Sequence, residues 1–574
     1  GESCELRCSR CAMGACSSKN EEPASVPIAQ HQDVNHQHVG TDVGAMGADP
    51  AGAKPFHTQS SCTKSGFSSD VQKDKASITG HFAHKNTSRS LMEVYDVDDG
   101  AILGRGACGT VSVVKRKDTG EQYACKEVSL DGMAGSTVDE LRKEIEIQRG
   151  LTHPNICRLF ESFEEGGQIY IIMEICTGGA LVSRMKNHRH GYGERAAATL
   201  VEKMLSATLY CHHNGVVHRD IKLDNFIYEH ESEDAELKLI DFGFAAEVSP
   251  GKEAMWDQLG TPSYMAPELW GDSIKEYDSS VDMWALGVVT YMLLSGKRPF
   301  HHQDRKEKGR MIKHDPLVFK GQEWEKVSDE AKDFCRKLMQ KNPRDRMPGR
   351  DAIHHPWITK QSTLHDGIDA AHEMARHNEV IESLEAFCQA DDLKKLALES
   401  IAFSTPPSKL EELRNMFVKM DVDDSGTISF AEFQSAMLMH PEVPPDKVKQ
   451  MFHNMDLNGS GDVDYLEFLS ATISTQKSGQ DRMSAMAAFS ILDRDGDGFL
   501  GKEDILAAVE DTYTSGEVDE MFVVHGKNGL INYQNFKVLM FSEKGHKLYR
   551  AASSLASDSS KDEWTIVKDE PAAR

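Results

Sequence analysis

The sequence lacks any long uninterrupted hydrophobic run. Its most apolar stretch, MWALGVVTYMLL, covers only residues 283–294, whereas a membrane-spanning helix needs about 20 apolar residues. We therefore expect no transmembrane helix, and the stretch fits a buried helix of a large domain.

Positive charge is also scarce. The 574 residues include 65 Lys and Arg against 91 Asp and Glu, which gives a formal net charge of −26. A chain this acidic is a poor general binder of nucleic acid, but it suits cations or basic peptides. The 12 cysteines show no paired metal-ligand spacing in the body of the chain, which favours reduced thiols in a cytoplasmic protein.

Aliphatic residues are few at both ends of the chain. We expect residues 1–90 to form a disordered N-terminal extension and residues 545–574 an acidic tail. Between them, residues 95–358 alternate strand-like with helix-like apolar patterns, and residues 361–410 look helical and amphipathic. A pattern then repeats through residues 411–541, so the chain is long enough for several domains with their own cores.

Three acidic loops repeat at a spacing of about 36 residues, which is typical of a repeat architecture. They are DVDDSGTISFAE (421–432), DLNGSGDVDYLE (456–467) and DRDGDGFLGKED (493–504). Each begins with the D-x-[DN]-x-[DNS]-G pattern of a helix–loop–helix calcium site, in which Gly permits the sharp turn. One such loop could be a solvated turn, but that explanation does not account for three in register.

The ligands follow from the loop positions that supply oxygen to calcium: side chains at 1, 3, 5 and 12, a carbonyl at 7 and a water at 9. In the third loop the last position is Asp504 instead of Glu, which is one methylene shorter, so we expect weaker calcium binding and more tolerance of magnesium. The predicted ligands are Asp421, Asp423, Ser425, Thr427 and Glu432; Asp456, Asn458, Ser460, Asp462, Asp464 and Glu467; and Asp493, Asp495, Asp497, Phe499 and Asp504.

A fourth loop, residues 524–535, keeps the apolar frame but contains no carboxylate. Its flanking residues Phe522 and Phe536 are also two residues closer together than those of the other loops. We expect it to bind no calcium and to serve as the structural partner of the third loop, because an unpaired unit would leave a strand edge and an apolar face bare. The expected antiparallel ladders join Ile428 with Val463 and Leu500 with Ile531.

A second set of motifs precedes the loops. These motifs are LGRGACGTV (103–111), YACK (123–126), HRDIKLDN (218–225), DFG (241–243) and APE (266–268). A glycine-rich turn alone is weak evidence, but the order and spacing of all five match the protein-kinase set.

Each motif has a task in phosphoryl transfer. Asp220 is expected to accept or orient the substrate hydroxyl, and Lys222 to contact the transferred phosphate. Asn225 and Asp241 are expected to bind Mg²⁺. Glu144 could by itself be an ordinary helix-surface acid, but its position ahead of HPNI (153–156) fits the acid that holds Lys126. The predicted ATP-binding residues are Leu103, Gly104, Gly106, Gly109, Val111, Ala124, Lys126, Glu144, Met173, Glu174 and Cys176.

Over residues 95–541 the chain resembles the calcium-dependent protein kinases, which join a serine/threonine kinase to a calmodulin-like domain. The resemblance implies an α+β fold: a bilobal protein-kinase domain (95–358), a junction helix (361–410) and an all-α calmodulin-like domain of two EF-hand pairs (411–541). It also implies a calcium-activated kinase that uses ATP, Mg²⁺ and Ca²⁺ to phosphorylate Ser or Thr of protein substrates, with the junction blocking the active site until calcium binds. Ala180 departs from the family pattern, which has Glu there, and this puts the usual preference for basic substrates in doubt.

In related kinases the HRD arginine, here Arg219, often binds a phosphate on the activation loop. Asp257, four residues before Thr261, stands at the position of that phosphate. A carboxylate would give Arg219 a permanent partner of lower charge, so we expect no need for loop phosphorylation. The alternative is that Asp257 is a solvated loop acid.

The N-terminal segment MGACSSKN (13–20) matches a myristoylation motif, with Cys16 available for palmitoylation. If translation starts at Met13, we expect lipid anchoring through Gly14 and Cys16, and otherwise a cytoplasmic protein; a monomer is expected in both cases. A chance match is the alternative. Zinc binding by the four N-terminal cysteines (Cys4, Cys8, Cys11 and Cys16) lacks a second ligand cluster.

Two rival functions would also combine a kinase fold with calcium loops. The first is a calcium-regulated scaffold with an inactive kinase fold, against which the intact Lys126, Asp220, Asn225 and Asp241 argue. The second is a kinase controlled by a separate calmodulin, against which the two near-ideal calcium loops argue.

Overall fold

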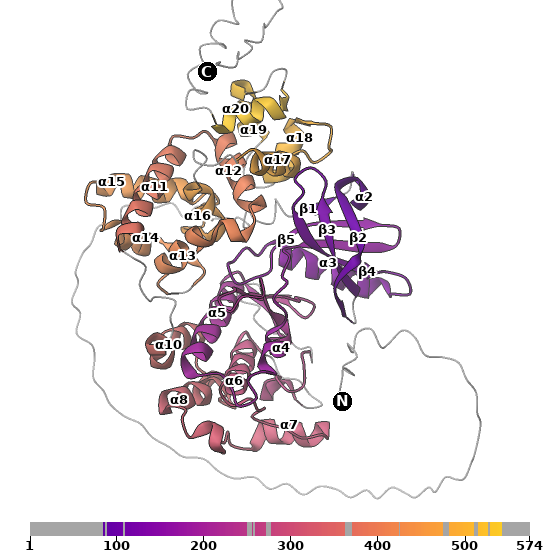
Figure 1. The fold of residues 1–574 in the computed structure, drawn as a ribbon, viewed down its shortest axis with the longest axis vertical. Helices are drawn as coiled ribbons and strands as arrows, with labels where there is room; N and C mark the ends of the chain where they lie inside the picture. The colour runs from indigo at the N-terminus through magenta and orange to yellow at the C-terminus, as the bar shows by residue number, and fades with distance from the viewer. Residues whose placement is uncertain are drawn as a thin grey trace, which may run out of the picture.

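The computed structural model describes eleven stretches of the chain and shows two lobes with a helical region beside them (Figure 1). The N-terminal lipidation motif, Asp257 and the acidic tail lie outside the described residues. The described residues are 84–86, 89–106, 109–248, 255, 259–270, 277–361, 370–423, 425–473, 481–509, 515–525 and 529–541.

The smaller lobe is a six-stranded sheet in the order β1-β5-β6-β4-β3-β2, with one long helix beside it. Alternating apolar residues in the strands, among them Val114, Ile169 and Ile171, are buried in its core, as the two-residue period of a strand requires. The elements are β1 (His84–Asn86), α2 (Leu91–Val94), β2 (Tyr95–Gly106), β3 (Gly109–Arg116), β4 (Gln122–Ser129), α3 (Gly135–Arg149), β5 (Leu159–Glu165) and β6 (Gln168–Met173).

Strand β1 corrects the expectation that all of residues 1–90 are disordered. Residues 84–86 pair in parallel with residues 161–163 of β5, and Lys85 forms an ion pair with Glu164. A composition poor in aliphatic residues does not prevent three residues from completing the edge of an existing sheet, because backbone groups supply the bonds.

The larger lobe is mainly helical and is built around α6, which contains the most apolar stretch of the sequence. The expectation of a buried helix there is confirmed: Trp284 and Leu286 are fully buried, and Gly296 ends the helix at φ 70°, a conformation that favours glycine. The main elements are α4 (Leu181–Met185), α5 (Glu194–His213), β7 (Val216–Val217), β8 (Phe226–Tyr228), β9 (Leu237–Leu239), β10 (Ala246–Glu247), α6 (Ser280–Ser295), α7 (Arg305–His314), α8 (Asp329–Leu338), α9 (Gly349–Ile353) and α10 (Pro356–Gln361).

The junction contains two described helices instead of the single helix expected, namely α11 (Ala370–Cys388) and α12 (Asp392–Ser404). The chain breaks between them because Asp391 caps α12, where its side chain accepts a hydrogen bond from the Lys394 N–H at 2.9 Å. Such side-chain capping satisfies a backbone donor that a continuous helix would use internally.

The calcium-loop region, residues 411–541, consists of helix–loop–helix units joined in pairs. Its helices surround α12, and they lie beside the smaller lobe in Figure 1. The elements are α13 (Glu411–Met420), β11 (Thr427–Ser429), α14 (Phe430–Met437), α15 (Pro445–Met455), β12 (Asp462–Asp464), α16 (Tyr465–Thr472), α17 (Asp481–Leu492), β13 (Phe499–Leu500), α18 (Lys502–Val509), α19 (Ser515–His525), β14 (Ile531–Asn532) and α20 (Tyr533–Phe541).

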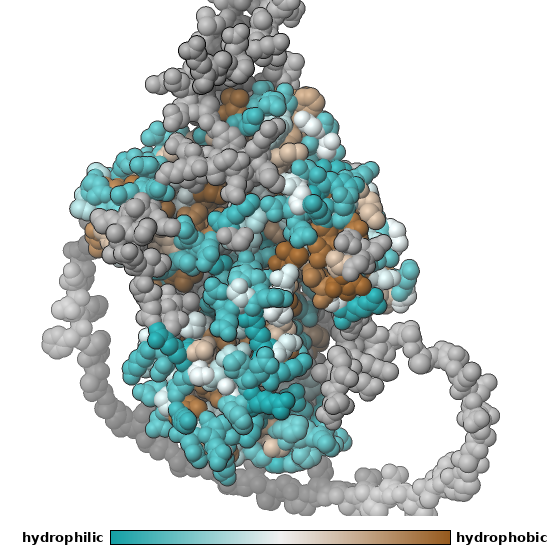
Figure 2. All heavy atoms as spheres, viewed as in Figure 1, coloured by the Kyte–Doolittle hydropathy of each residue, from teal (hydrophilic) through white to brown (hydrophobic). Residues whose placement is uncertain are grey.

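Two hydrophobic cores organise the described residues. One lies inside the larger lobe, and the other runs without interruption from the smaller lobe through α12 into the calcium-loop region. Phe160 of β5 and Phe403 of α12 connect the parts of the second core, with their rings edge to face at 5.5 Å. The larger lobe shows a mainly hydrophilic face, whereas hydrophobic side chains reach the surface over the strands of the smaller lobe (Figure 2).

Candidate active site and calcium loops

The glycine-rich turn is formed by the ends of β2 and β3. Their register pairs Gly104 with Val111 and Gly106 with Gly109, while residues 107–108 lie outside the described residues. Gly109 has φ 144°, and a Cβ there would lie 2.0 Å from the Glu127 carbonyl oxygen. Only glycine fits this position, and backbone at such a turn can come close to phosphate groups.

Lys126 lies opposite Val111 on the neighbouring strand β4. Its ammonium is 3.5 Å from the Glu144 carboxylate of α3, which confirms the predicted pairing. The Glu144 carboxylate also lies close to Gly243 of the DFG motif. The ion pair therefore links β4 and α3 beside the segment that contains Asp241.

The expected adenine-binding residues come together on adjacent strands. Ala124 pairs with Met173, Cys176 is buried just beyond β6, and Leu103 is 40% exposed. The Glu174 side chain has a different use: Lys238 approaches it at 2.8 Å, and the Arg158 N–H donates to it at 3.2 Å. Only the backbone of Glu174 is therefore available to a nucleotide.

Asp220 is the centre of a compact polar cluster. One carboxylate oxygen accepts from the Thr261 hydroxyl at 2.8 Å and from the Thr261 N–H at 2.9 Å. The other oxygen pairs with the Lys222 ammonium and lies 3.4 Å from the Asn225 amide nitrogen. These three side chains and the Thr261 N–H hold the carboxylate in one orientation, where it can accept a proton from a hydroxyl.

The two residues predicted to hold magnesium are brought together by the backbone. The Ile240 N–H donates to the Asn225 carbonyl at 2.9 Å, so Asp241 is placed beside Asn225. Asp241 adopts φ 66°, an uncommon conformation for a residue with a side chain, of the kind that accumulates at functional sites. An amide oxygen and a carboxylate are ligands that Mg²⁺ accepts.

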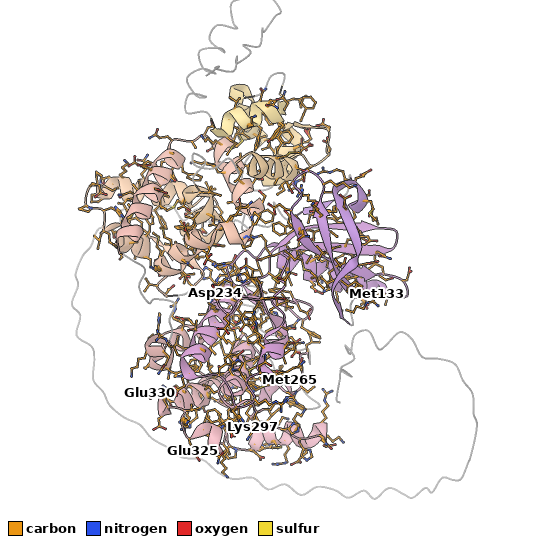
Figure 3. The ribbon with its side chains drawn as sticks, in the orientation of Figure 1. Met133, Asp234, Met265, Lys297, Glu325 and Glu330 are labelled. Atoms are coloured by element: carbon orange, nitrogen blue, oxygen red, sulfur yellow. The ribbon has the colours of Figure 1, made fainter. Side chains whose placement is uncertain are left out.

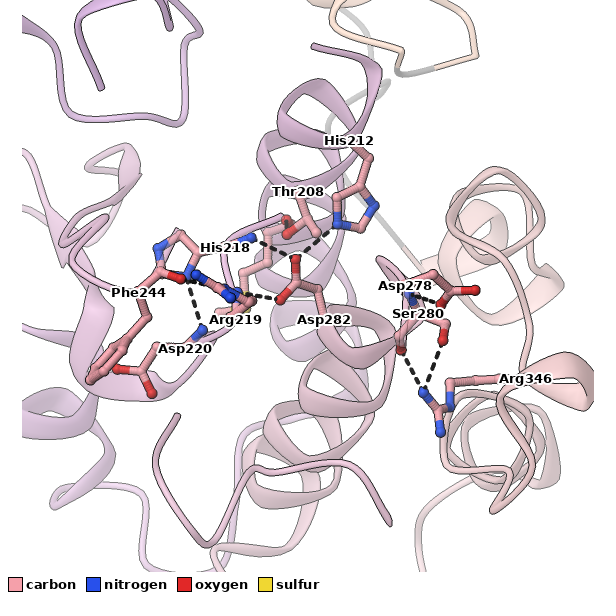
Figure 4. A network of polar contacts seen from close by, with 11 residues as sticks. Thr208, His212, His218, Arg219, Asp220, Phe244, Asp278, Ser280, Asp282 and Arg346 are labelled. Atoms are coloured by element: carbon pink, nitrogen blue, oxygen red, sulfur yellow. Dashed lines mark hydrogen bonds and ion pairs between the residues drawn. The ribbon is translucent and has the colours of Figure 1, made fainter. Parts of the chain in front are cut away.

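Sequence reasoning missed the buried acid that positions the catalytic loop. Asp282 of α6 is 1% exposed and accepts hydrogen bonds from the backbone N–H groups of His218 at 2.9 Å and Arg219 at 2.8 Å (Figure 4). The His212 ring approaches the same carboxylate at 2.9 Å, and these donors keep the pKa of Asp282 below its usual value despite the burial. The signal available in the sequence was an acid, Asp282, directly before the apolar stretch 283–294.

The Arg219 guanidinium already has partners from the described residues. It donates to the Phe244 carbonyl at 2.5 Å, the Ala245 carbonyl at 3.3 Å and the Tyr277 hydroxyl at 3.3 Å. Because Asp257 lies outside the described residues, its pairing with Arg219 stays a prediction.

The first calcium loop gathers its carboxylates around one point. Oxygens of Asp421, Asp423 and Glu432 lie within 4.8 Å of one another. The Glu432 carboxylate accepts from the Val422 N–H at 2.8 Å and from the Ser429 N–H at 2.8 Å. A cluster of oxygens with this spacing fits a hard divalent cation.

The backbone contacts to the last loop acid recur in the second and third loops, and the carboxylate cluster recurs in the third. Glu467 accepts from the Asn458 N–H at 3.1 Å and from the Asp464 N–H at 2.9 Å. In the third loop Asp504 accepts from Arg494 and Gly501, so the shorter side chain makes equivalent backbone contacts. Oxygens of Asp493, Asp495 and Asp504 also lie within 4.8 Å of one another.

The predicted ladders between loops are confirmed. Ile428 pairs with Val463, and Leu500 pairs with Ile531, in antiparallel register. Ile531 is 1% exposed, so the fourth loop packs against the third, as expected of a structural partner. Residues 526–528 lie outside the described residues.

Three buried acids of the first two loops have raised pKa values. Burial raises the pKa of Asp421 to about 8 and that of Asp464 to about 6. Burial, and then the neighbouring Asp464, raises the pKa of Glu467 as well. Buried carboxylates that repel one another are stabilised when a cation binds between them.

The junction contacts Arg158, which in turn contacts the hinge of the nucleotide site, residues 174–176. The Arg158 guanidinium, 5% exposed, donates to the Phe403 carbonyl at the end of α12 at 2.7 Å and lies over the Phe403 ring. Since the Arg158 N–H also binds the Glu174 side chain, the end of α12 is one residue away from the hinge. Sequence reasoning did not find this contact, because its partners are 245 residues apart.

The sequence matches three known domain families. It matches the protein kinase domain over residues 97–358, an EF-hand domain pair over residues 410–473 and an EF hand over residues 486–507. The fold and the site therefore define a protein kinase that carries its own EF-hands.

Curated relatives identify the family. The chain is 32% identical over 481 residues to calcium-dependent protein kinase 11 of Oryza sativa subsp. japonica, covering 80% of this chain and 78% of the relative. It is 33% identical over 470 residues to calcium-dependent protein kinase SK5 of Glycine max, covering 80% and 88%. It is also 33% identical over 458 residues to calcium-dependent protein kinase 12 of Arabidopsis thaliana, covering 78% and 90%.

The chain belongs to the calcium-dependent protein kinases. It is a calcium-activated serine/threonine protein kinase that acts on protein substrates and uses ATP, Mg²⁺ and Ca²⁺. The alternative of a scaffold with an inactive kinase fold is not supported. Among the residues that the structure describes, no helix is both long and apolar enough to span a bilayer.

Proposed function

We propose that Asp220 is the catalytic base of this kinase and that Lys222 stabilises the transferred phosphate. Mg²⁺ and ATP supply the charge neutralisation and the phosphoryl group, with Asn225 and Asp241 as the magnesium ligands and Lys126 on the phosphates. The observation that carries this proposal is the cluster in which Thr261, Lys222 and Asn225 fix the Asp220 carboxylate.

The protein's own groups do most of the positioning. The Thr261 hydroxyl and N–H hold one oxygen of Asp220, which leaves the carboxylate oriented toward an incoming hydroxyl. Asp282 anchors the backbone of His218 and Arg219, so the loop carrying Asp220 cannot rotate away. Such fixed orientation is a large part of the catalytic effect in phosphoryl transfer.

We infer that calcium at the first three loops controls the active site through the junction. In support of this proposal, α12 lies among the calcium-loop helices, with the Ser400 hydroxyl donating to the Ala488 carbonyl at 3.1 Å, while its last turn contacts Arg158. When calcium is absent, the junction moves to block the active site. In the described arrangement, α11 and α12 pack on the calcium-loop region instead.

The test is a calcium titration of peptide phosphorylation by the full-length protein. Activity is expected to rise steeply with calcium, and Asp220→Ala to lose at least ~100-fold in kcat while binding the same number of calcium ions. Equal activity in chelator and in calcium would contradict the regulation. Near wild-type activity of Asp220→Ala would contradict the assignment of the base.

Three expectations from the sequence remain proposals. Asp257 substitutes for an activation-loop phosphate, so unphosphorylated protein is active with calcium, and Asp257→Ala lowers its turnover. Myristoylation of Gly14 and palmitoylation of Cys16 anchor the protein to membranes if Met13 is the start, and it is otherwise cytoplasmic. The protein acts as a monomer. Mass spectrometry of the purified native protein tests the lipidation, and its sedimentation tests the monomeric state.

A further inference from the structure

The surface next to the catalytic cluster carries a group of basic side chains. The segment that continues from Thr261 reaches Ser263, whose hydroxyl accepts a hydrogen bond from the Lys308 ammonium at 3.4 Å. Lys308 belongs to α7, and Arg298 and Arg305 lie close enough to act on its charge. Met265 of the same segment and Lys297, the neighbour of Arg298, both lie in the larger lobe in Figure 3.

The nearby acids Asp304 and Glu307 have other partners than this group. Asp304 accepts from the backbone N–H of Glu307 at 2.8 Å, and Glu307 pairs with Arg310 at 2.7 Å. In the part of the chain that the structure describes, neither Arg298 nor Lys308 forms an ion pair. The exposed Asp224 lies within electrostatic reach of Tyr264, as Arg298 does, so one acid faces this group from the catalytic loop.

The cations repel one another, and this repulsion contributes to a lowered pKa of Lys308. Partial burial, followed by the charges of Arg298 and Arg305, keeps the pKa of Lys308 below its usual value. Arg305 is held over the Trp270 ring at 5.7 Å, so it cannot move far from the group. An anion bound here would relieve the repulsion.

Lys308 lies a short distance from Asp220, where the phosphoacceptor hydroxyl is expected to bind. Thr261 is bonded to Asp220, and Ser263 lies two residues further along the chain. An extended peptide advances about 3.3 Å per residue. An extended substrate whose acceptor hydroxyl lies at Asp220 can therefore reach Lys308 within about five residues of that acceptor.

We propose that this kinase selects substrates with Asp or Glu within about five residues of the phosphoacceptor, bound by Lys308 and Arg298. This inference rests on the proposed function, because it names the substrate class of the same active site. The chain as a whole carries a net charge of −26, so its overall field does not attract acidic peptides. The selection is therefore made by this local group of cations. Salt screens their attraction for an acidic peptide.

The experiment uses full-length protein in saturating calcium and peptides with one serine in a neutral background. Each peptide carries a single Glu or a single Lys at one position within about five residues of the serine. At one or more positions, Glu is expected to exceed Lys about tenfold in kcat/KM. Raising the salt concentration is expected to reduce this ratio.

Single substitutions test whether Arg298 and Lys308 cause the preference for Glu. Arg298→Gln and Lys308→Met are each expected to lower the Glu-to-Lys ratio about three- to fivefold. The matched control is Lys297→Met, which removes the same charge next to Arg298 from a side chain paired with Glu323 at 2.7 Å, and it should keep the wild-type ratio. Because Arg298 is exposed, its variant tests the inference even if Lys308→Met is unstable.

The outcomes separate the two levels of the proposal. No phosphorylation of any peptide in calcium would overturn the proposed function itself. Phosphorylation with no Glu-to-Lys discrimination, or with Lys preferred at every position, would leave the kinase function intact and overturn the inference. Discrimination that survives in both Arg298→Gln and Lys308→Met would overturn the assignment to this group.

Discussion

Single carboxylates in the calcium loops differ in how deeply they are buried, and burial raises the pKa of Asp421 and Glu467. Glu467 is completely buried and Asp421 is 2% exposed, whereas Asp495 and Asp497 are exposed. In the calcium-free protein the buried acids are stabilised by protons, and in the bound form by the cation. Protons and calcium therefore compete for the same oxygens.

The competition between protons and calcium predicts opposite pH dependences for the stability of the calcium-free protein and for its calcium affinity. The pKa of Asp421 rises from 3.8 to about 8 on folding, so the calcium-free folded state binds more protons than the unfolded chain between these values. Its stability should therefore fall as the pH rises through this range, and the calcium affinity should rise. The melting temperature in chelator and the calcium midpoint, each measured from pH ~6 to ~8, check both directions.

Asp421→Asn supplies the control, because it removes the most strongly shifted of the first loop's acids. Its melting temperature in chelator should depend less on pH than that of the wild type. A wild-type melting temperature that rises with pH in chelator, or a calcium midpoint that is the same at both ends of the range, would contradict this account.

At the scale of elements, one side chain serves two purposes in each of the first two calcium loops. Glu432 is the last calcium ligand expected in its loop, and it also forms the capping box of α14 with Ser429. Glu467 has the same double position before α16 with Asp464. The loop and the following helix therefore move together when calcium binds.

The fourth loop contributes packing rather than ligands, and Ile531→Asp tests this. The substitution places a carboxylate at a buried ladder position, so it should destabilise α17–α20 by about 2–4 kcal/mol. Leu530→Asp is the matched control, since Leu530 is 42% exposed and should change stability little. Thermal unfolding measures the loss, and calorimetry should count three calcium ions in the wild type.

A destabilisation of the same size in both variants would contradict the packing role of Ile531. A fourth calcium ion bound by residues 524–535 would contradict the structural role of the whole loop.

At the scale of the whole molecule, the smaller lobe, α12 and the calcium-loop region share one hydrophobic core. Polar contacts also cross the boundary between the calcium-loop region and the two lobes: Arg414 of α13 lies 3.6 Å from Glu229 of the larger lobe, and Arg116 of the smaller lobe donates to the Ser490 hydroxyl at 2.8 Å. The Cβ of any residue replacing Gly426 in the first loop would lie 2.6 Å from the Tyr210 ring. The calcium loops therefore lie in direct contact with the kinase lobes.

Arg158→Ala should weaken this coupling. Without the guanidinium, the Phe403 carbonyl loses a buried charged donor, so the calcium midpoint of activation should rise about tenfold. The KM for ATP in saturating calcium should also rise, because Arg158 adjoins the hinge. Kinase assays across calcium and ATP concentrations measure both quantities, with activity in chelator as the baseline.

Lys409→Ala is the comparison for Arg158→Ala. It removes a cation from the same boundary, but from an exposed pair with Glu121 at 3.3 Å, and exposed pairs contribute little. A calcium midpoint of Arg158→Ala that equals the wild-type value would contradict the coupling through the hinge.

The sequence by itself determined the features that depend on local residue patterns. The calcium loops, their ladders, the buried helix α6 and the pair of Lys126 with Glu144 all follow from residue types at fixed spacings, because each spacing corresponds to one local geometry. Most of the candidate site could therefore be predicted.

Only the tertiary structure decided how distant segments meet. Strand β1 exists because β5 offers an edge, and α12 ends against Arg158 because the calcium-loop helices and the smaller lobe bury a common core. Asp282 acts on the catalytic loop across 64 residues, and Lys308 reaches Ser263 across 45. Contacts between residues far apart in sequence depend on packing and on burial of apolar surface, which no local spacing encodes.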